Sequence, residues 1–316
     1  MKVLITGGAG FIGSHTVRRL LSEGNEVVCV DDFNDYYSPE IKEKNISEFL
    51  ESKKFTLERC DIRDANKMKK IFKKYSPSHV IHLAARAGVR PSIKDPLLYH
   101  EVNIGGTTNV LECARLNGIE NMVFASSSSV YGGCKKIPFK ESEWPLYPIS
   151  PYAATKLGGE NLCRYYHEQY GMNITCLRFF TVYGPSGRPD MAPYLFTDAI
   201  YKGESIKRFG DGTTKRDYTY VSDIVDGVIA AVKKPLGYEI INLGNNSPIM
   251  LNDFIATIEK ILNRKAKIIQ LGEQQGDVSI TYADIGKAKK LLNFKPQVKI
   301  HEGIKEFVSW YLKQSC

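Results

Sequence analysis

The chain of 316 residues is 43% hydrophobic, 11% aromatic and 25% charged, which excludes disordered, collagen-like and disulfide-scaffold classes and suits about two domains. Its 43 Lys and Arg against 35 Asp and Glu give a net charge of +8, which favours anionic ligands, but the basic residues are scattered and predict no nucleic-acid surface. Seven cysteines without a Cys-x-x-Cys pair predict neither disulfides nor a metal site, and the lack of an 18-residue apolar run or a signal-peptide core predicts a cytoplasmic protein outside the membrane.

The first half of the chain alternates β-branched runs with segments of helical periodicity, which is typical of βαβ units on a parallel sheet. Six strands are expected, at Lys2–Thr6, Glu26–Val30, Phe55–Glu58, His79–Leu83, Asn121–Ala125 and Asn173–Phe179. Helical spacing is found at Ser14–Leu21, Ala65–Tyr75, Tyr99–Asn117 and Pro151–Tyr170. The predicted fold class is therefore α/β, with a doubly wound parallel sheet.

The second half begins after a loop rich in Gly and Pro at residues 184–189. Beyond it we expect a strand at Tyr238–Leu243 and helices at Tyr194–Tyr201, Leu251–Leu262, Asp284–Leu292 and His301–Leu312. The predicted division is a domain of residues 1–183 and a smaller mixed α/β domain of residues 184–316. A segment near residues 216–243 is expected to return and pack on the first domain.

A glycine-rich segment, Thr6-Gly7-Gly8-Ala9-Gly10-Phe11-Ile12-Gly13, connects the first strand to the first helix. Glycines let the backbone approach a pyrophosphate closely, and the helix N-terminus favours its negative charge. Asp31 lies 18 residues after Gly13 at the end of the second strand, where a carboxylate can accept from the ribose hydroxyls of an adenosine. Asp31, Asp32 and Asp35 would repel a 2′-phosphate, and residues 31–36 contain no arginine, so the predicted cofactor is NAD rather than NADP.

A second constellation lies in the helix that begins at Pro151, where Tyr152 and Lys156 are four residues apart and share one face. A phenol of reference pKa ~10 is a poor base at neutral pH, but a nearby ammonium and a cationic nicotinamide stabilise the phenolate, by ~1.4 kcal/mol per pKa unit. Serines at positions 126–129 close the fifth strand and offer a hydroxyl partner. Tyr-x-x-x-Lys alone is commonly a surface pair, but combined with a dinucleotide turn and a serine cluster it predicts a catalytic base.

Further motifs are His82-Leu83-Ala84-Ala85, Arg178-Phe179-Phe180-Thr181-Val182-Tyr183-Gly184-Pro185, Arg216-Asp217-Tyr218 and Gly276-Asp277-Val278. Over essentially the whole chain these motifs resemble the extended short-chain dehydrogenase/reductase superfamily, and within it the UDP-sugar 4-epimerases. The resemblance implies a Rossmann domain that binds NAD and a UDP-sugar site beneath the smaller domain. It also implies a homodimer formed through two helices per subunit, here near residues 99–117 and 151–170.

The resemblance assigns catalytic roles to Tyr152, Lys156 and Ser127. Tyr152 would remove the 4-hydroxyl proton while carbon 4 gives a hydride to NAD, and the 4-keto sugar would turn over and take the hydride back on its other face. Ser127 would hydrogen-bond the 4-oxygen, and Lys156 would hold the nicotinamide ribose and lower the pKa of Tyr152. The residues matched to the cofactor site are Gly7, Gly10, Phe11, Ile12, Gly13, Asp31, Asp61, Ile62, Leu83, Ala84, Ala85, Asn103, Tyr152 and Lys156. Of these, Asp61 and Ile62 would flank the adenine.

The substrate side of the resemblance places Arg216 on the UDP pyrophosphate, where a planar guanidinium suits phosphate oxygens, and Asp277 on the ribose. Relatives that dehydrate or decarboxylate the keto sugar carry a carboxylic acid just before Val-Tyr-Gly. This chain has Ser128 and Ser129 there as substrate contacts. The keto sugar should therefore simply be reduced again, which is the outcome of epimerisation.

The identity of the sugar depends on a few positions. Thr281 stands where strict UDP-glucose enzymes carry a bulky tyrosine, and its small size admits a 2-N-acetyl group or a uronate. Residues 181–191 resemble the UDP-glucuronate 4-epimerases, in which Thr181, in place of asparagine, would lie near the sugar carboxylate and Arg188 near the phosphates. Arg86 and Arg90 would either face an acidic substituent or lie on the surface. The predicted substrate is UDP-N-acetylglucosamine, UDP-glucose or UDP-glucuronate.

Two other functions are compatible with the same motifs. One is a nucleotide-sugar oxidoreductase with net redox, and the other is a catalytically silent sensor that binds NAD. Nothing about binding alone requires Tyr152, Lys156 and Ser127 together, so the epimerase is the preferred interpretation.

Overall fold

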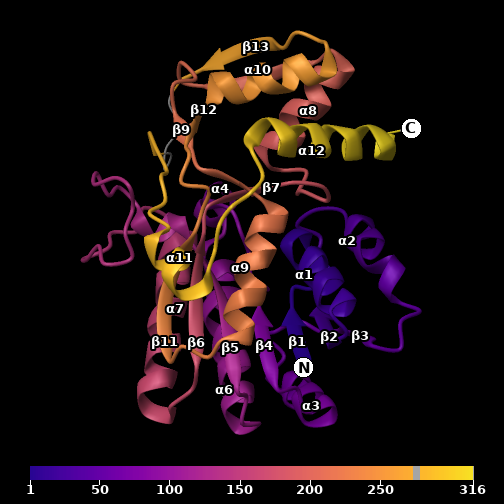
Figure 1. Cartoon of the computed structure of the whole chain (residues 1–316), viewed down its shortest axis with the longest axis vertical. Helices are drawn as coiled ribbons and strands as arrows, with labels where there is room; N and C mark the ends of the chain where they lie inside the picture. The colour runs from indigo at the N-terminus through magenta and orange to yellow at the C-terminus, as the bar shows by residue number, and fades with distance from the viewer. Residues whose placement is uncertain (273–277, 316) are drawn as a thin grey trace.

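The computed structural model describes residues 1–272 and 278–315. Its centre is a parallel sheet of seven strands in the order β3-β2-β1-β4-β5-β6-β11 (Figure 1). The strands are β1 (Lys2–Thr6), β2 (Glu26–Asp31), β3 (Phe55–Arg59), β4 (His79–His82), β5 (Asn121–Ser127), β6 (Ile174–Phe179) and β11 (Tyr238–Leu243). This is the strand order of a doubly wound Rossmann sheet with one further strand, and it confirms the predicted fold class.

Helices cover both faces of the sheet, because its strands are apolar on both sides. In β1, Val3 and Ile5 belong to one hydrophobic core and Leu4 to the other, as alternation along a strand requires. One face packs against α1 (Phe11–Ser22), α9 (Val221–Lys233) and α11 (Gly286–Leu292), with α2 (Pro39–Ile46) and a 3-10 turn (Ser47–Phe49) beside α1. The other face packs against α3 (Ala65–Tyr75), α6 (Thr107–Leu116) and α7 (Pro151–Tyr170).

Two elements predicted in the second half of the chain, a strand and a helix, are part of the body formed around this main sheet. Tyr238–Leu243 forms β11, which pairs in parallel with β6. The helix expected at Asp284–Leu292 begins at Gly286, and its Ala288 and Leu292 join the core beside β11 and α9. Burial against an existing apolar sheet edge decides this placement, which the periodicity of the helix alone does not reveal.

The helix expected at Tyr99–Asn117 is composite. It consists of α5 (Pro96–His100), a π-helical turn (Glu101–Gly106) and α6, preceded by the short α4 (Val89–Lys94). The π turn contains Asn103 and a Gly-Gly pair, a feature that commonly marks functional positions in helices. Between β5 and α7, a 3-10 turn (Ser128–Tyr131) begins within the serine cluster.

A smaller body lies beyond the carboxyl ends of the sheet strands (Figure 1). It contains α8 (Ala192–Lys202), α10 (Leu251–Leu262) and α12 (Ile300–Ser315) around their own core. Three pairs of short strands accompany these helices: β7 (Thr181–Tyr183) with β10 (Tyr218–Tyr220), β8 (Ser205–Phe209) with β13 (Lys267–Leu271), and β9 (Lys215–Arg216) with β12 (Ile249–Met250). Within the described residues, no helix combines the length and apolar character that crossing a bilayer requires.

Candidate active site

A cavity of about 430 Å³ lies where the carboxyl ends of the sheet strands meet the helix N-termini. This is the edge at which open α/β sheets bind their ligands. The predicted site residues that line it are Gly7, Gly10, Phe11, Ile12, Gly13, Asp31, Asp61, Ile62, Leu83, Ala84, Ala85, Ser127, Ser128, Ser129, Tyr152, Lys156, Thr181 and Arg188. The fold therefore brings together residues that are up to 181 positions apart in the chain.

The glycine-rich turn at one end of the cavity leaves no room for side chains. A Cβ on Gly13 would lie 2.1 Å from the Gly7 carbonyl oxygen, and a Cβ on Gly7, where φ is +71°, would lie 2.7 Å from the Ala84 nitrogen. Gly10 precedes the first residue of α1, so the free N–H groups of that helix face the cavity. This arrangement fits a pyrophosphate held against backbone and helix dipole.

Asp31 ends β2 at the wall of the same cavity. Its two carboxylate oxygens accept hydrogen bonds from the backbone N–H groups of Ala9 and Phe33, both at 3.0 Å. Burial raises the pKa of this carboxyl, while these bonds and the charge of Lys42 act in the opposite direction. The carboxylate is thus fixed beside the glycine turn with lone pairs left over, and it fits the ribose hydroxyls of an adenosine.

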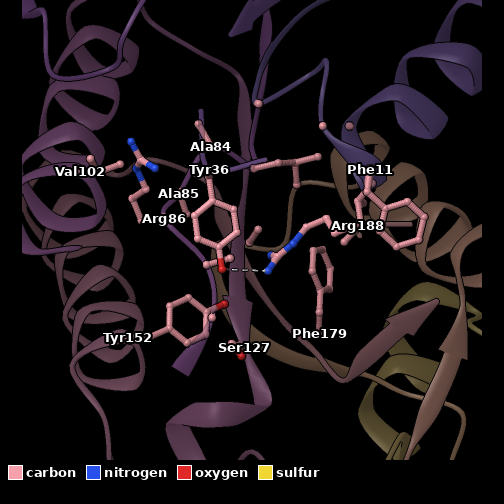
Figure 2. A pocket seen from close by; sticks show the side chains of 18 of the residues that line it. Phe11, Tyr36, Ala84, Ala85, Arg86, Val102, Ser127, Tyr152, Phe179 and Arg188 are labelled. Atoms are coloured by element: carbon pink, nitrogen blue, oxygen red, sulfur yellow. Dashed lines mark hydrogen bonds between the residues drawn. The ribbon is translucent and has the colours of Figure 1, made fainter. Parts of the chain in front are cut away.

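The opposite end of the cavity holds Tyr152 and Ser127 (Figure 2). Ser127 is the last residue of β5, and its hydroxyl accepts from the Ser129 N–H at 3.1 Å. Burial raises the pKa of Tyr152, and the hydrogen bond with Ser127 and the charge of Arg188 lower it in part. The ring of Tyr152 is also held edge-on against Tyr99 of α5, with centroids 6.3 Å apart. A phenol and a hydroxyl so arranged can share one substrate oxygen.

Lys156 lies one helical turn after Tyr152 and is buried. Its ammonium donates to the Ala125 carbonyl oxygen at 2.7 Å and lies 5.2 Å from the centre of the Phe124 ring. Burial lowers the pKa of Lys156 to about 8, against the opposing influence of Cys163 and Glu160. The ammonium has two further N–H donors for a ligand in the cavity.

Arg188 enters the cavity from the loop after β7, and its contact partners were not predicted from the sequence. It forms a two-point ion pair with Asp190, at 2.9 and 2.6 Å, and its guanidinium lies 5.1 Å from the ring centre of Tyr36. The hydroxyl of Tyr36 donates to Asp190 at 3.1 Å, and Figure 2 shows this tyrosine in the middle of the cavity. Tyr36 and Tyr37 lie in the loop five and six residues after Asp31, the end of β2, and this position is the signal that could have identified them.

Three predicted site residues do not line the cavity, and a fourth lies outside the described part of the chain. Asn103 is buried behind the wall, where it accepts from the Arg86 N–H at 2.8 Å and donates to the Arg86 carbonyl at 3.0 Å. Thr281 accepts from the Asp217 N–H at 3.1 Å, and Arg216 donates to the Lys215 carbonyl at 2.9 Å, both in the smaller body. Asp277 is the position that the structure does not describe.

The two arginines after β4 have different surroundings. Arg86 lines the cavity, and Figure 2 shows it near Ala85. Arg90 is exposed on α4, with its guanidinium 4.9 Å from the ring centre of Phe209 in β8. Arg86 is thus placed to meet an anionic ligand, while Arg90 contacts the smaller body.

The fold and the site together define a class of protein. The NAD dependent epimerase/dehydratase family matches residues 3–244, and the chain belongs to this family. It is 48% identical to a UDP-glucuronate 4-epimerase of Thermodesulfobacterium geofontis, over 97% of this chain and 95% of that protein.

Two solved structures have the same architecture over their whole length. One is UDP-glucuronic acid 4-epimerase from Bacillus cereus in complex with UDP-glucuronic acid and NAD, with a TM-score of 0.94, 38% identity and 100% coverage of both chains. The other is UDP-glucose 4-epimerase from Thermotoga maritima with UDP-glucose, with a TM-score of 0.93, 32% identity and 100% coverage of both chains. The resemblance to UDP-sugar 4-epimerases and the predicted cofactor, NAD, are thereby confirmed.

Proposed function

We propose that this protein, a NAD-dependent UDP-sugar 4-epimerase, acts on UDP-glucuronate and inverts its carbon 4. The observation that carries the proposal is the meeting of Tyr152, Ser127, Thr181 and Arg188 on one cavity. The strand end that bears Ser127 carries only serines at positions 126–129, so no acid lies there to divert the keto sugar.

The cofactor end of the cavity is the glycine turn with Asp31, Asp61 and Ile62, and the reactive end is Tyr152 with Lys156. Bound along this cavity, NAD supplies a hydride acceptor that later returns the hydride, and a positive charge that favours the tyrosinate. Tyr152 takes the proton of the 4-hydroxyl and gives it back after the sugar has turned over. Ser127 holds the same oxygen, and Lys156 holds the nicotinamide ribose and stabilises the tyrosinate.

Three features support the glucuronate in particular. Thr181 lines the cavity beside the serines and offers a hydroxyl to a carboxylate, where an asparagine would suit a neutral hydroxymethyl group. Arg86 and Arg188 both place a guanidinium group in the lining of the cavity, that of Arg188 in an ion pair with Asp190. The relative from T. geofontis and the neighbour from B. cereus both carry the name of a glucuronate enzyme.

The remaining assignments stay proposals of the same kind. Residues 1–183 form the NAD-binding domain together with the returning segment near 216–243, and residues 184–316 form the smaller UDP-sugar domain. Arg216, Asp277, Ser128, Ser129 and Thr281 contact the substrate, and Asn103 supports the cofactor wall. The protein acts in the cytoplasm as a homodimer, without nucleic acid or metal.

The experiment that tests the substrate is a comparison of three sugars on purified protein without added NAD. UDP-glucuronate, UDP-glucose and UDP-N-acetylglucosamine are incubated separately, and inversion at carbon 4 is followed by proton NMR. We expect the highest kcat/KM for the glucuronate. A higher kcat/KM for UDP-glucose or the N-acetyl sugar would contradict the proposed substrate, and turnover that requires added NADH would indicate net redox instead.

A variant of Thr181 and a matched control test whether this residue determines the preference for UDP-glucuronate over UDP-glucose. Thr181→Asn should lower kcat/KM for UDP-glucuronate about tenfold, equivalent to about 1.4 kcal/mol, and leave UDP-glucose within a factor of about two. Thr213→Asn, in an exposed loop of the smaller body, is the control and should change neither value. Equal losses for both sugars in Thr181→Asn would show that Thr181 does not read the carboxylate.

A further inference from the structure

A buried ion pair lies directly beneath the catalytic residues. The Arg178 guanidinium donates to both carboxylate oxygens of Glu160, each at 2.8 Å, and the two residues are 2% and 1% exposed. The Ser126 hydroxyl donates to the same carboxylate at 2.5 Å. One carboxylate therefore binds β5, β6 and α7 together through three charge-assisted hydrogen bonds.

These three elements carry the catalytic residues. Ser126 is the neighbour of Ser127 and is paired in register with Arg178, and Glu160 follows Lys156 by one turn on the same face of α7. On the other side of Arg178, the ring of Tyr131 lies 4.8 Å from the guanidinium. The network thus connects the strand that carries Ser127 (β5), the helix that carries Lys156 (α7) and the strand that precedes Thr181 (β6).

Fold stability alone does not account for such a pair. Replacing a buried ion pair by apolar side chains of similar volume is often neutral or stabilising, because desolvation of two charges offsets their attraction. A buried charge four residues from a catalytic lysine has a second consequence, since the potential that it creates acts on that lysine.

The charged and titratable groups around Lys156 come from several elements. Burial and the charge of Lys156 lower the pKa of His82 in β4 to about 3, so its ring is neutral. Cys163 and Glu160 on α7 both raise the pKa of Lys156. Cys176 of β6 faces Cys163, and burial holds its pKa well above the ordinary value. Of the described groups named here, Glu160 is the one that carries a negative charge, and its ion-pair partner Arg178 carries a positive charge.

We propose that the Glu160–Arg178 pair is a positioning device for catalysis, in which Arg178 and Ser126 hold the Glu160 carboxylate on the face of α7 one turn from Lys156, where its charge favours the Lys156 ammonium. Glu160 touches neither substrate nor cofactor and acts through Lys156. The inference rests on the proposed function for its catalytic meaning, but its electrostatic part concerns the resting protein alone.

The test uses protein labelled with 13C at the lysine Cε, titrated by NMR, with the Lys156 signal assigned by its loss in Lys156→Met. In Glu160→Gln we expect the Lys156 titration to move down by about one pH unit. The alkaline limb of kcat for UDP-glucuronate should move by the same amount, because the neutral lysine no longer stabilises the tyrosinate. Glu168→Gln is the matched control, since Glu168 lies on the same helix in an exposed pair with Arg164, and it should shift neither titration.

The double variant Glu160→Met with Arg178→Met separates electrostatics from packing, and it keeps the test open if the single variant does not fold. We expect the double variant to fold and its Lys156 titration to lie below that of the unaltered protein, by less than in Glu160→Gln, because the positive charge of Arg178 is removed together with the carboxylate. A Lys156 titration equal to that of the unaltered protein in the double variant would overturn the inference. If the unaltered protein does not epimerise UDP-glucuronate, the proposed substrate fails, and the lysine titration still decides this inference.

Discussion

The reactive end of the cavity depends on single side chains whose properties differ from those they have in water. Tyr152 is half-buried in the cavity and desolvation raises its pKa, so in the proposed mechanism the phenol needs the positive charge of Lys156 and of the oxidised cofactor to act as a base. Ser127 and Lys156 are held by backbone partners, Ser129 N–H and Ala125 C=O, which fixes them before substrate arrives. Preorganisation of this kind is what the proposed catalytic roles of the three residues require.

The role of Tyr152 predicts the behaviour of Tyr152→Phe. Loss of the hydroxyl removes the base but leaves the glycine turn and Asp31 untouched, so kcat should fall by about 10²–10⁴ while the protein still purifies with NAD. Rate is measured by NMR and NAD content by its release on denaturation. Near-normal turnover in this variant would contradict the assigned base.

His82 gives a prediction about pH and stability. Its ring lies between the Thr6 hydroxyl at 2.6 Å and the Thr107 hydroxyl at 3.0 Å, and burial lowers its pKa to about 3. The unfolded chain takes up a proton at this residue below pH ~6.5 and the folded chain does not. The stability that neutral His82 contributes is therefore complete above pH ~6.5 and is lost as pH falls toward 3, by up to ~1.4 kcal/mol per pH unit.

The comparison of His82→Gln with the unaltered protein isolates this effect, because all other groups titrate in both. The free energy of unfolding, from urea titrations between pH 4.5 and 8, should show a constant difference at pH 7–8 that shrinks as pH decreases. His100→Gln, at an exposed position, serves as the control. A difference independent of pH would show that His82 titrates normally in the folded state.

At the scale of elements, the site depends on where strands end and helices begin. Helix α7 starts immediately before Tyr152, and the Ser150 hydroxyl caps it by accepting from the Ala153 N–H at 3.1 Å. The cap therefore fixes the first turn, which carries Tyr152, the proposed base. Asp64 caps α3 in the same way, accepting from the Lys67 N–H at 2.9 Å, but α3 carries no site residue.

This pair of caps allows stability and catalysis to be separated. Ser150→Ala and Asp64→Ala should each lower the free energy of unfolding by about 1 kcal/mol. Only Ser150→Ala should also lower kcat, by roughly tenfold, because the first turn of α7 loosens around Tyr152. Urea unfolding and NMR turnover are the two measurements. Equal kcat for the two variants would mean that packing alone positions Tyr152.

The sequence predicted the elements of the main sheet well, since buried parallel strands are short β-branched runs that end in Gly, Asp or Ser. It missed α9, whose residues 221–233 contain a run of Val and Ile that resembles a strand. It placed α11 with the second half of the chain, because packing between distant segments leaves no local trace, whereas the returning segment expected near residues 216–243 includes β11, which pairs with β6. In the cavity, motif residues were found, whereas Tyr36 and Asp190 were missed because their roles arise from contacts between distant loops.

At the scale of the whole molecule, one surface suits the proposed homodimer. Exposed apolar side chains gather on α5, α6 and α7, with Leu97 74%, Leu116 56% and Tyr165 51% exposed. These helices lie against one another on the same face of the sheet. Exposed apolar side chains on neighbouring helices suit an interface between subunits.

The dimer can be tested by placing a charge on that surface. Tyr165→Glu should convert a two-chain species into a single chain in sedimentation at micromolar concentration, because a carboxylate would be buried without a partner. Leu195→Glu, at a 51% exposed position on α8, is the matched control and should remain a dimer. A monomeric unaltered protein, or dissociation of the control alone, would contradict the proposed interface.

The proposed function requires that carbon 4 is oxidised and reduced again within one cavity, so that the hydride never leaves the protein. The most direct measurement is to incubate the purified protein, without added NAD, with UDP-glucuronate deuterated at carbon 4 and to analyse the product by NMR and mass spectrometry. We expect the product to be UDP-galacturonate, the carbon 4 epimer, with the deuterium still on carbon 4. Absence of the epimer, or loss of the label to solvent during inversion, would contradict it.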